Sequence, residues 1–377
     1  MPEEQITGSA VGVRCCKMFR EEVAPTVRSS VIPEQFRAFV AEKADDGVTR
    51  GTRDVRRADL PGGEGSSGER VAAGEVEIRV EWSSINYKDA LATTASGKVA
   101  RISPLIPGID LAGEVVAGDE PSLAPGSRVL AHGYDLGVAR HGGWAQYARV
   151  PAAWIVPLPD GLDARLAMAL GTAGFTAALS VIRLEARGLR PGNGPVLVTG
   201  ASGGVGSTAV GILAARGYEV WGATGKRDEE GRLRSLGAAG FVSRGEYTGA
   251  PERALDRERW AAAVDSVGGA SLPYVLRTLR YGGAVAASGN AGGAGFATTV
   301  FPFILRGVAL IGIDSAYLSI DERREVWRRL ATDLRPRGLG EGLTDVSLES
   351  LEPSIDAMLR GAARGRWIVR IVGTAPT

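Results

Sequence analysis

Cysteine and histidine are scarce in this sequence, which has two of each among its 377 residues. Cys15 and Cys16 are neighbours near the N-terminus, and adjacent cysteines rarely bridge to each other. Two cysteines also cannot build a disulfide framework, so a reducing, cytoplasmic compartment is expected. The histidines, His132 and His141, fall at a predicted strand end and in a glycine-rich loop. A zinc site needs several thiolate and imidazole ligands, so we expect no bound metal.

An excess of one charge and a long apolar run are also missing. Lys and Arg number 44 and Asp and Glu 43, a formal net charge of +1, which suggests neither a nucleic-acid nor an acidic-lipid partner. The charged N-terminus does not resemble a signal peptide. The most apolar late stretch, 300–313, is interrupted by Pro302 and Arg306 and is too short to span a bilayer. We expect a soluble protein that acts on a small molecule.

The length suits two domains better than one core. Residues 1–35 lack periodicity and are interpreted as an N-terminal extension. Short apolar segments bounded by Gly or Pro then predict a β-rich unit, a small barrel or sandwich. Its strands are expected near 37–41, 75–82, 111–116, 128–131, 145–150 and 155–157. A Gly- and Ser-rich loop over 61–74 separates the first two.

The pattern changes near residue 160. Apolar residues at helical spacing predict a helix over 163–182, with Asp163 as its N-cap. Strands then alternate with helices, which is typical of a parallel, doubly wound sheet and of the α/β class. These strands begin near residues 195, 218, 240, 260, 283 and 308. A last strand, at 366–372, stands outside this alternation, and we expect it to return to the first domain.

A glycine-rich loop, Gly200-Ala-Ser-Gly-Gly-Val-Gly206, lies between a predicted strand and a predicted helix. Without a Cβ the backbone can turn tightly and approach a pyrophosphate, and the free N–H groups at the helix start can meet its charge. The plainer alternative is a turn that only lets the helix and the strand pack closely. The surrounding alternation favours a dinucleotide site.

The end of the second strand of this sheet indicates which nucleotide is bound. An NAD site usually has an acid there to bind the ribose hydroxyls, whereas this strand ends in Ala223-Thr-Gly-Lys-Arg227. A 2′-phosphate would find Thr224, Lys226 and Arg227 near it, and Arg244 after the third strand. The alternative is that these cations are solvated surface charges. The missing acid favours NADPH.

Several sequence blocks carry a family resemblance. The blocks are Asn86-Tyr-Lys-Asp89, Pro107-Gly-Ile-Asp110, Gly143-Trp-Ala-Gln-Tyr-Ala, Gly171-Thr-Ala-Gly174, Thr199-Gly-Ala-Ser-Gly-Gly-Val-Gly206, Asp265-Ser-Val-Gly268, 298–306 and Gly312-Ile-Asp-Ser315. In this order they resemble the zinc-free medium-chain dehydrogenase/reductases and are close to the acryloyl-CoA reductase (NADPH) subfamily, whose members are also labelled quinone oxidoreductases. The resemblance covers roughly residues 36–373.

The resemblance implies a Rossmann domain over 165–315 and a discontinuous GroES-like catalytic domain over 36–164 and 316–377. It also implies NADPH as hydride donor and a homodimer. The extension and the 61–74 loop depart from the family pattern, and Asn290 stands where relatives commonly have an apolar residue. The cofactor contacts implied are Tyr87, Ser202, Gly203, Gly204, Val205, Thr224, Gly225, Lys226, Arg244, Asn290, Ile304 and Ser315.

The activity implied by the resemblance is reduction of an activated C=C bond, such as that of acryloyl-CoA, by NADPH. Tyr87, Asn86 and Asp89 are the candidate catalytic residues. Tyr87 would either donate the proton or position the nicotinamide, and a structural brace is the alternative for Asp89. A quinone substrate, a carrier-bound enoyl chain and a non-catalytic NADPH-binding redox sensor remain as alternative functions.

Overall fold

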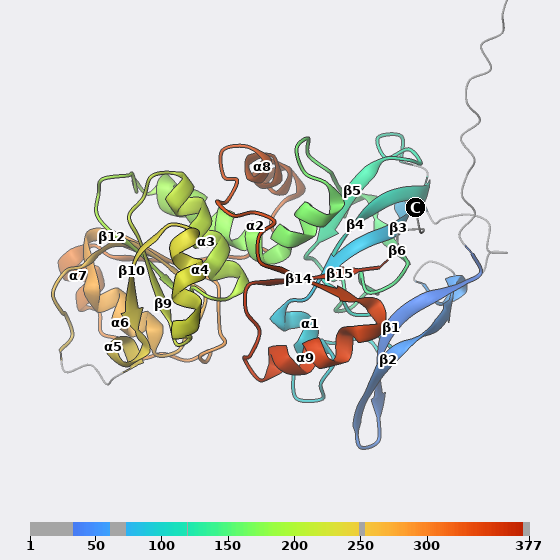
Figure 1. Ribbon diagram of the computed structural model, residues 1–377, viewed down its shortest axis with the longest axis horizontal. Coiled ribbons are helices and arrows are strands. Elements are labelled where there is room, and N and C mark those ends of the chain that lie inside the picture. Colours follow the sequence, from blue (N-terminus) through green and yellow to red (C-terminus); the bar gives the residue numbers. More distant parts are fainter. Residues whose placement is uncertain (1–32, 61–72, 119, 249–252, 372–377) are drawn as a thin grey trace, which may run out of the picture.

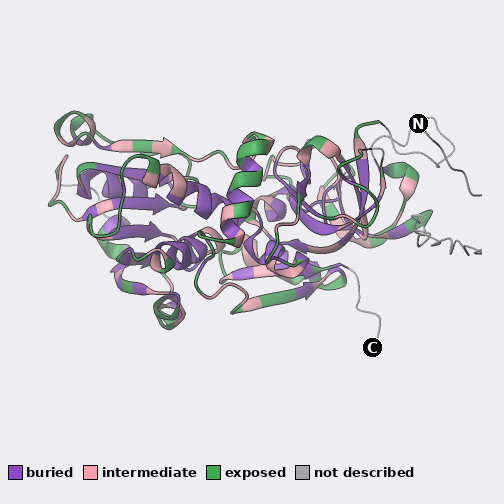
Figure 2. Cartoon of the chain, turned by 90° about the horizontal axis from the view of Figure 1, so that it is seen from above, coloured by how far each residue is buried: buried purple, intermediate pink, exposed green. Residues whose placement is uncertain are grey.

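The computed structural model describes residues 33–60, 73–118, 120–248 and 253–371 (Figure 1). Nearly all of the N-terminal extension and of the 61–74 loop therefore lies outside the described residues. Figure 2 shows two sheets of buried strands, with exposed residues concentrated on the surrounding helices and loops. The two sheets correspond to the β-rich unit and the alternating unit expected from the sequence.

A seven-stranded sheet forms the β-rich unit, with the order β14-β15-β3-β4-β5-β7 and β6 paired to β3. Alternation places Val76, Ile78 and Val80 of β3 in the core, each fully buried. Glu77 is buried between them and is paired with Arg57 and Arg149 at 2.7 and 2.5 Å. The strands are β3 Glu75–Ser84, β4 Asp110–Gly118, β5 Arg128–His132, β6 Tyr147–Pro151, β7 Val156–Pro157, β14 Leu343–Ser347 and β15 Arg366–Arg370.

A hairpin of β1 (Gln35–Ala44) and β2 (Gly47–Arg56) projects beside this sheet (Figure 1). The strand predicted near 37–41 is confirmed as part of β1, which buries Phe36 and Phe39. Strand β2 was not predicted. None of its residues is fully buried, so it carries no apolar alternation from which a strand could have been inferred.

A six-stranded parallel sheet forms the alternating unit, with the order β10-β9-β8-β11-β12-β13. Counted along the chain this is the order 3-2-1-4-5-6 of dinucleotide-binding sheets, which confirms the predicted doubly wound sheet. Its strands are β8 Val196–Thr199, β9 Val220–Thr224, β10 Ala238–Ser243, β11 Trp260–Asp265, β12 Leu279–Ala287 and β13 Ala309–Gly312. The helices between them are α3 Gly204–Ala215, α4 Glu230–Ser235, α5 Arg244–Thr248, α6 Ser271–Thr278 and α7 Phe301–Arg306.

The long helix α2 (Ala164–Ala186) joins the two units and contacts strands of both sheets (Figure 1). Asp163 caps it as predicted, because its carboxylate accepts a hydrogen bond from the Leu166 amide at 2.7 Å. By length and composition α2 could cross a membrane, but 78% of its apolar window is buried inside the protein. The helix is therefore part of the core between the sheets.

The C-terminal part of the chain returns to the first sheet. After α8 (Ile320–Ala331) and α9 (Leu351–Leu359), strand β15 pairs antiparallel with β3, from Ile368 opposite Ser84 to Arg370 opposite Trp82. The predicted return is confirmed, and the β-rich unit is built from two separated stretches of chain. The exact domain boundaries, at 164/165 and 315/316, stay a prediction.

Candidate active site

The predicted nucleotide loop lies between β8 and α3, where glycine is needed at several positions. Gly200 has φ +60°, and a Cβ on Gly206 would lie 2.2 Å from the carbonyl oxygen of Gly200. A Cβ on Gly203, at the N-cap of α3, would meet only that same carbonyl, at 3.3 Å. The loop is therefore tightly folded but open on the Gly203 side, as the backbone cradle of a pyrophosphate must be.

The end of β9 adjoins this loop. The hydroxyls of Ser202 and Thr224 are 3.0 Å apart, and the Lys226 amide donates to the Thr224 hydroxyl at 3.1 Å. The Lys226 ammonium donates to the Ala363 carbonyl at 2.5 Å, so it is not a freely solvated charge. Burial, and next the nearby guanidinium of Arg364, lowers the pKa of Lys226. Ser202, Thr224 and Lys226 are thus brought together.

The remaining predicted contacts occupy different places. Val205 is partly buried in α3, Asn290 is exposed after β12, and the Ser315 hydroxyl accepts a hydrogen bond from Thr176 of α2 at 2.8 Å. Ile304 lies on α7 and is 67% exposed. The loops that follow β8, β9, β10, β12 and β13 lie at the carboxyl edge of the sheet, which is where sheets of this kind bind dinucleotides. Arg244 begins α5 after β10, and its side chain is outside the described part of the chain.

Tyr87 is the first residue of the short helix α1 (Tyr87–Ala92) and is 41% exposed. Its hydroxyl makes no hydrogen bond with the residues that the structure describes, so it is available to a ligand. The turn before it is rigid, because Asn86 and Asp89 form a capping box in which the Asn86 amide donates to the Asp89 carboxylate at 2.8 Å. The Asn-Tyr-Lys-Asp block therefore presents the phenol on a fixed support.

Asp89 is fully buried and accepts hydrogen bonds from backbone amides of a second loop. The amides of Gly108 and Ile109 donate to it at 3.1 and 2.7 Å. Burial, and next the carboxylate of Asp110, raises the pKa of Asp89 to about 7. A carboxyl group with no exposed surface does not face a substrate. Its contacts are those of a brace that joins the Tyr87 turn to the loop before β4.

A largely buried polar cluster behind this turn, formed by Asp110, Thr172 and Arg366, was not predicted from the sequence. Asp110 accepts from Ser84, from the Asn86 side chain at 2.8 Å and from the Thr172 amide at 3.0 Å. Asp110 and Thr172 both belong to blocks that carried the family resemblance. Their contacts could not be inferred, because their partners are distant in the sequence.

Arg366, on β15, completes the cluster. Its guanidinium donates to the carbonyls of Ala169 and Met168 at 2.9 and 3.0 Å and to the Asn86 side chain at 3.1 Å, and lies 4.0 Å from Asp110. Burial lowers the pKa of Arg366. A Cβ on Gly204 would lie 3.0 Å from its Cδ. Arg366 therefore contacts both the Tyr87 turn and the nucleotide loop. The available signal was a cation at the start of a strand whose centre, residues 367–369, is apolar.

Both histidines hold hydrogen bonds inside the protein. The fully buried His132 accepts from the Trp327 indole at 2.9 Å, and burial, then Arg323, lowers the pKa of His132 well below its usual value. The ring of His141 accepts from the Ile106 amide at 3.1 Å. Among the described residues no group of three or more His, Cys, Asp or Glu could hold a metal ion. Metal independence stays a prediction.

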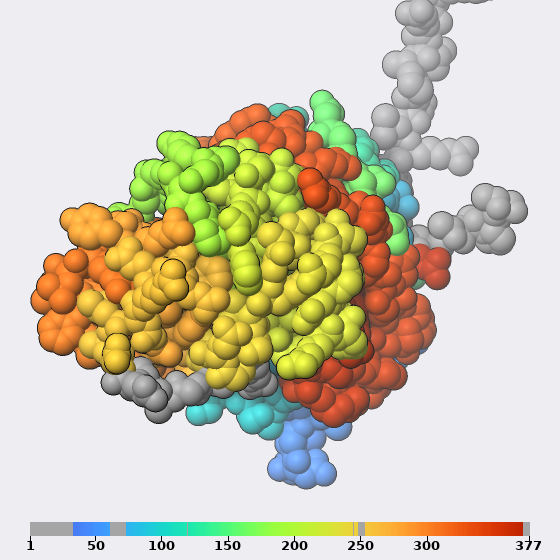
Figure 3. All heavy atoms as spheres, turned by 60° about the vertical axis from the view of Figure 1, so that its left-hand side comes forward, coloured from blue at the N-terminus to red at the C-terminus, as the bar shows by residue number. Residues whose placement is uncertain are grey.

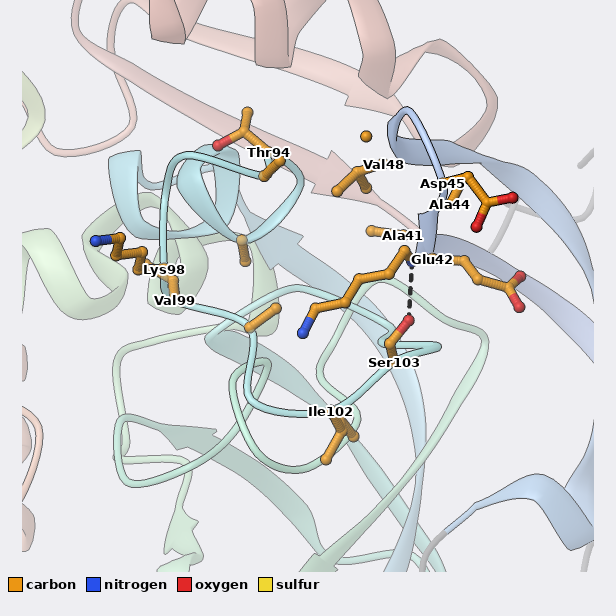
Figure 4. A pocket seen from close by; sticks show the side chains of 15 residues that line it. Ala41, Glu42, Ala44, Asp45, Val48, Thr94, Lys98, Val99, Ile102 and Ser103 are labelled. Atoms are coloured by element: carbon orange, nitrogen blue, oxygen red, sulfur yellow. Dashed lines mark hydrogen bonds between the residues drawn. The ribbon is translucent and has the colours of Figure 1, made fainter.

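A separate hollow of about 400 Å³ opens between the β1–β2 hairpin and the loop after α1 (Figure 4). Ala41, Val48, Thr94 and Ile102 are among its lining residues, and the Ser103 hydroxyl accepts from the Lys43 amide at 2.9 Å beside it. None of the predicted site residues lines this hollow. It is distinct from the candidate active site.

A glycine-loop cradle on a doubly wound sheet, facing a rigid Asn-Tyr turn of a β-rich domain, defines a two-domain, nucleotide-dependent oxidoreductase. Two family models match the chain, the alcohol dehydrogenase GroES-like domain over residues 72–160 and the zinc-binding dehydrogenase model over 204–332. The chain belongs to the medium-chain dehydrogenase/reductase family. The predicted family and fold class are confirmed.

Similar proteins span nearly the whole chain. The acrylyl-CoA reductase AcuI of Ruegeria pomeroyi is 45% identical, over 89% of this chain and 99% of its own length. YhfP of Bacillus subtilis, named a quinone oxidoreductase, is 46% identical over the same shares. Its crystal structure with NAD has a TM-score of 0.84 and covers 90% of this chain and all of that chain. The yhdH oxidoreductase of Salmonella enterica with NADP has a TM-score of 0.83 at 44% identity, covering 89% and 100%.

Helix α2 is kinked at Gly171, and a substitution at this kink should destabilise the protein. Gly171 has φ +51° and ψ −158°, and its Cβ would lie 2.5 Å from Asp110 Oδ2 and 2.6 Å from Arg366 Nη2. We expect Gly171→Ala to lower the unfolding free energy by about 3 kcal/mol or more, through strain and displacement of the cluster. Gly188→Ala is the control, at φ +96° with no atom within 4 Å; it should cost about 1 kcal/mol. Urea unfolding measures both, and equal losses would contradict a special role for the Gly171 contact.

Proposed function

We propose that this protein reduces the C=C bond of a 2-enoyl thioester, such as acryloyl-CoA, with NADPH. The observation that carries the proposal is that one residue contacts both the turn that presents Tyr87 and the nucleotide loop. Arg366 binds the Asn86 side chain at 3.1 Å and packs on Gly204 of the nucleotide loop. The identity of 45% with AcuI over 89% of the chain supports the choice of substrate.

The residues present fit a bound dinucleotide phosphate. The open face of Gly203 and the start of α3 suit the pyrophosphate, and Thr224 and Lys226 suit the 2′-phosphate. NADPH, when bound, supplies the hydride for the β-carbon of the thioester. As that C–H bond forms, the C=C electron pair moves toward the carbonyl and the thioester oxygen gains negative charge. Hydrogen-bond donors at that oxygen lower the barrier.

Tyr87 is the proton donor in this proposal. A phenol O–H can give its proton to the α-carbon. Its hydroxyl is free of hydrogen bonds within the described chain, and the residue is 41% exposed. Asn86 and Asp89 hold the turn in place through their capping box and do not touch the reacting atoms. Neither histidine is expected to hold zinc, and a cytoplasmic location belongs to the same proposal.

A quinone is the second candidate substrate. The observation in its favour is the identity of 46% with YhfP, which is named a quinone oxidoreductase. Hydride transfer to a quinone ring would use the same nucleotide loop. The two candidate reactions use the same hydride donor and differ only in the molecule that accepts the hydride. Only an assay with both substrates therefore distinguishes them.

The function is tested by NADPH consumption with acryloyl-CoA and, in parallel, with a simple quinone at the same concentration. We expect turnover with acryloyl-CoA that is at least about 10-fold faster than with the quinone, a difference of about 1.4 kcal/mol in the barrier. The same assay after dialysis against a chelator should show unchanged activity. Turnover with the quinone alone would overturn the thioester assignment, and no turnover with either would favour a non-catalytic NADPH-binding protein.

Tyr87→Phe tests the proton donor. Removing the hydroxyl of a general acid should lower kcat by about 100-fold while leaving the Kd for NADPH unchanged. Stopped-flow absorbance gives the turnover and fluorescence titration gives the Kd. A kcat within a few-fold of wild type would mean that the proton comes from elsewhere. Parallel losses of turnover and NADPH affinity would assign Tyr87 to positioning the nicotinamide.

A homodimer is also part of the proposal. Strand β13 lies at one end of the six-stranded sheet order and pairs with β12, and no other described strand pairs with its outer side. Exposed apolar side chains lie around that edge. They are Val300, Phe301, Ile304, Leu305 and Leu310. A twofold contact through the edge would cover them and join two sheets.

Leu310→Arg tests this interface. A cation on β13, beside the exposed apolar side chains, should dissociate the dimer, because burying it unpaired is costly. Light scattering after size-exclusion chromatography should give twice the chain mass of 39.3 kDa for the wild type and one chain mass for the variant. Thr49→Arg, on the exposed hairpin, is the control and should stay dimeric. A monomeric wild type would sink the dimer proposal.

A further inference from the structure

The segment that leads into β15 lies against the predicted 2′-phosphate end of the nucleotide site. The Gly365 amide donates to the Ser202 carbonyl at 3.1 Å, and the Lys226 ammonium donates to the Ala363 carbonyl at 2.5 Å. Figure 3 shows the yellow-green atoms that follow β9 beside the red atoms of the C-terminal segment. A residue of this segment is therefore close enough to affect the cofactor.

Two acids follow Lys226 on the short turn Arg227–Glu229. No acid stands at the tip of the strand itself, and Asp228 and Glu229 come directly after Arg227. Both are paired with Arg364, at 2.5 Å for Asp228 and 3.4 Å for Glu229. Glu229 has a second partner, Arg232, at 2.7 Å. Asp228 depends on Arg364 alone among the ion pairs of the described chain.

The charge of these acids bears on cofactor choice. A carboxylate near the adenosine ribose favours its free hydroxyls and repels a 2′-phosphate, which carries about two negative charges. Relatives of similar identity have been crystallised with NADP and with NAD, at 44% and 46% identity. Overall sequence similarity therefore does not decide between NADPH and NADH. The preference has to depend on how the charges near the adenosine ribose are compensated.

We propose that Arg364 determines the preference for NADPH over NADH by neutralising Asp228 and Glu229 from the other domain. The inference rests on the proposed function, because it assumes that the loop holds a nicotinamide nucleotide. The pair with Asp228 is half-exposed on both sides, so it contributes little to folding and a substitution leaves the fold intact. The Asp228–Arg364 pair acts instead on the electrostatic potential at the site of the 2′-phosphate.

The test uses the full chain and measures binding, independently of any substrate. Fluorescence titration gives the Kd for NADPH and for NADH with wild type, Arg364→Gln and the control Arg328→Gln. Arg328 has a similar exposed pair with Glu325 on α8. We expect Arg364→Gln to weaken NADPH binding by about 10-fold, the effect of one uncompensated charge near the phosphate, and not to weaken NADH binding, because a free carboxylate favours the ribose hydroxyls. Arg328→Gln should change neither.

A second variant separates charge compensation from a direct contact. In Asp228→Asn with Arg364→Gln the uncompensated acid is gone, so NADPH affinity should return to within about 3-fold of wild type. Equal weakening of both cofactors by Arg364→Gln, or no rescue by Asp228→Asn, would overturn the inference. A wild type that binds NADH more tightly than NADPH would instead overturn the cofactor of the proposed function.

Discussion

One buried cation, the guanidinium of Arg366, holds the junction between the two sheets. A buried guanidinium is costly unless its donors are paired, and here its partners come from three separate elements. The carbonyls of Met168 and Ala169 belong to α2, Asn86 belongs to the turn before α1, and Asp110 opens β4. Because each partner is held by the same group, their relative positions are set together.

This constraint explains how, in the proposed mechanism, the glycine loop and the exposed Tyr87 would form one site. Hydride transfer needs reacting atoms within about 3.5 Å and correctly oriented. The nucleotide loop packs on Arg366 at Gly204, and the Tyr87 turn is tied to it through Asn86. Asp89 adds a second brace to the loop before β4. The buried charges position the backbone, while the Tyr87 side chain stays exposed.

Helices and strands were predicted correctly where buried residues recur with the period of a helix or form a continuous apolar run. The parallel strands and α2 carry continuous or helical apolar patterns, and both were located from the sequence. Strand β2 was missed because it has no buried face. The nucleotide loop was recognised from its glycine spacing, which is a local feature, and the Asn-Tyr-Lys-Asp turn from its resemblance to the family. Asp110, Thr172 and Arg366 were not, because their contacts join residues up to 280 positions apart.

The sequence by itself determined the two units, the strand–helix alternation, the glycine loop and the family, because these depend on patterns within a few residues. Tertiary structure alone decided which charges are paired. Asp228 and Arg364 are 136 positions apart and meet only because the last strand returns to the first sheet. Charges compensate each other through space. The effect of Asp228, four residues after Thr224, on cofactor binding therefore cannot be inferred until its partner Arg364 is located.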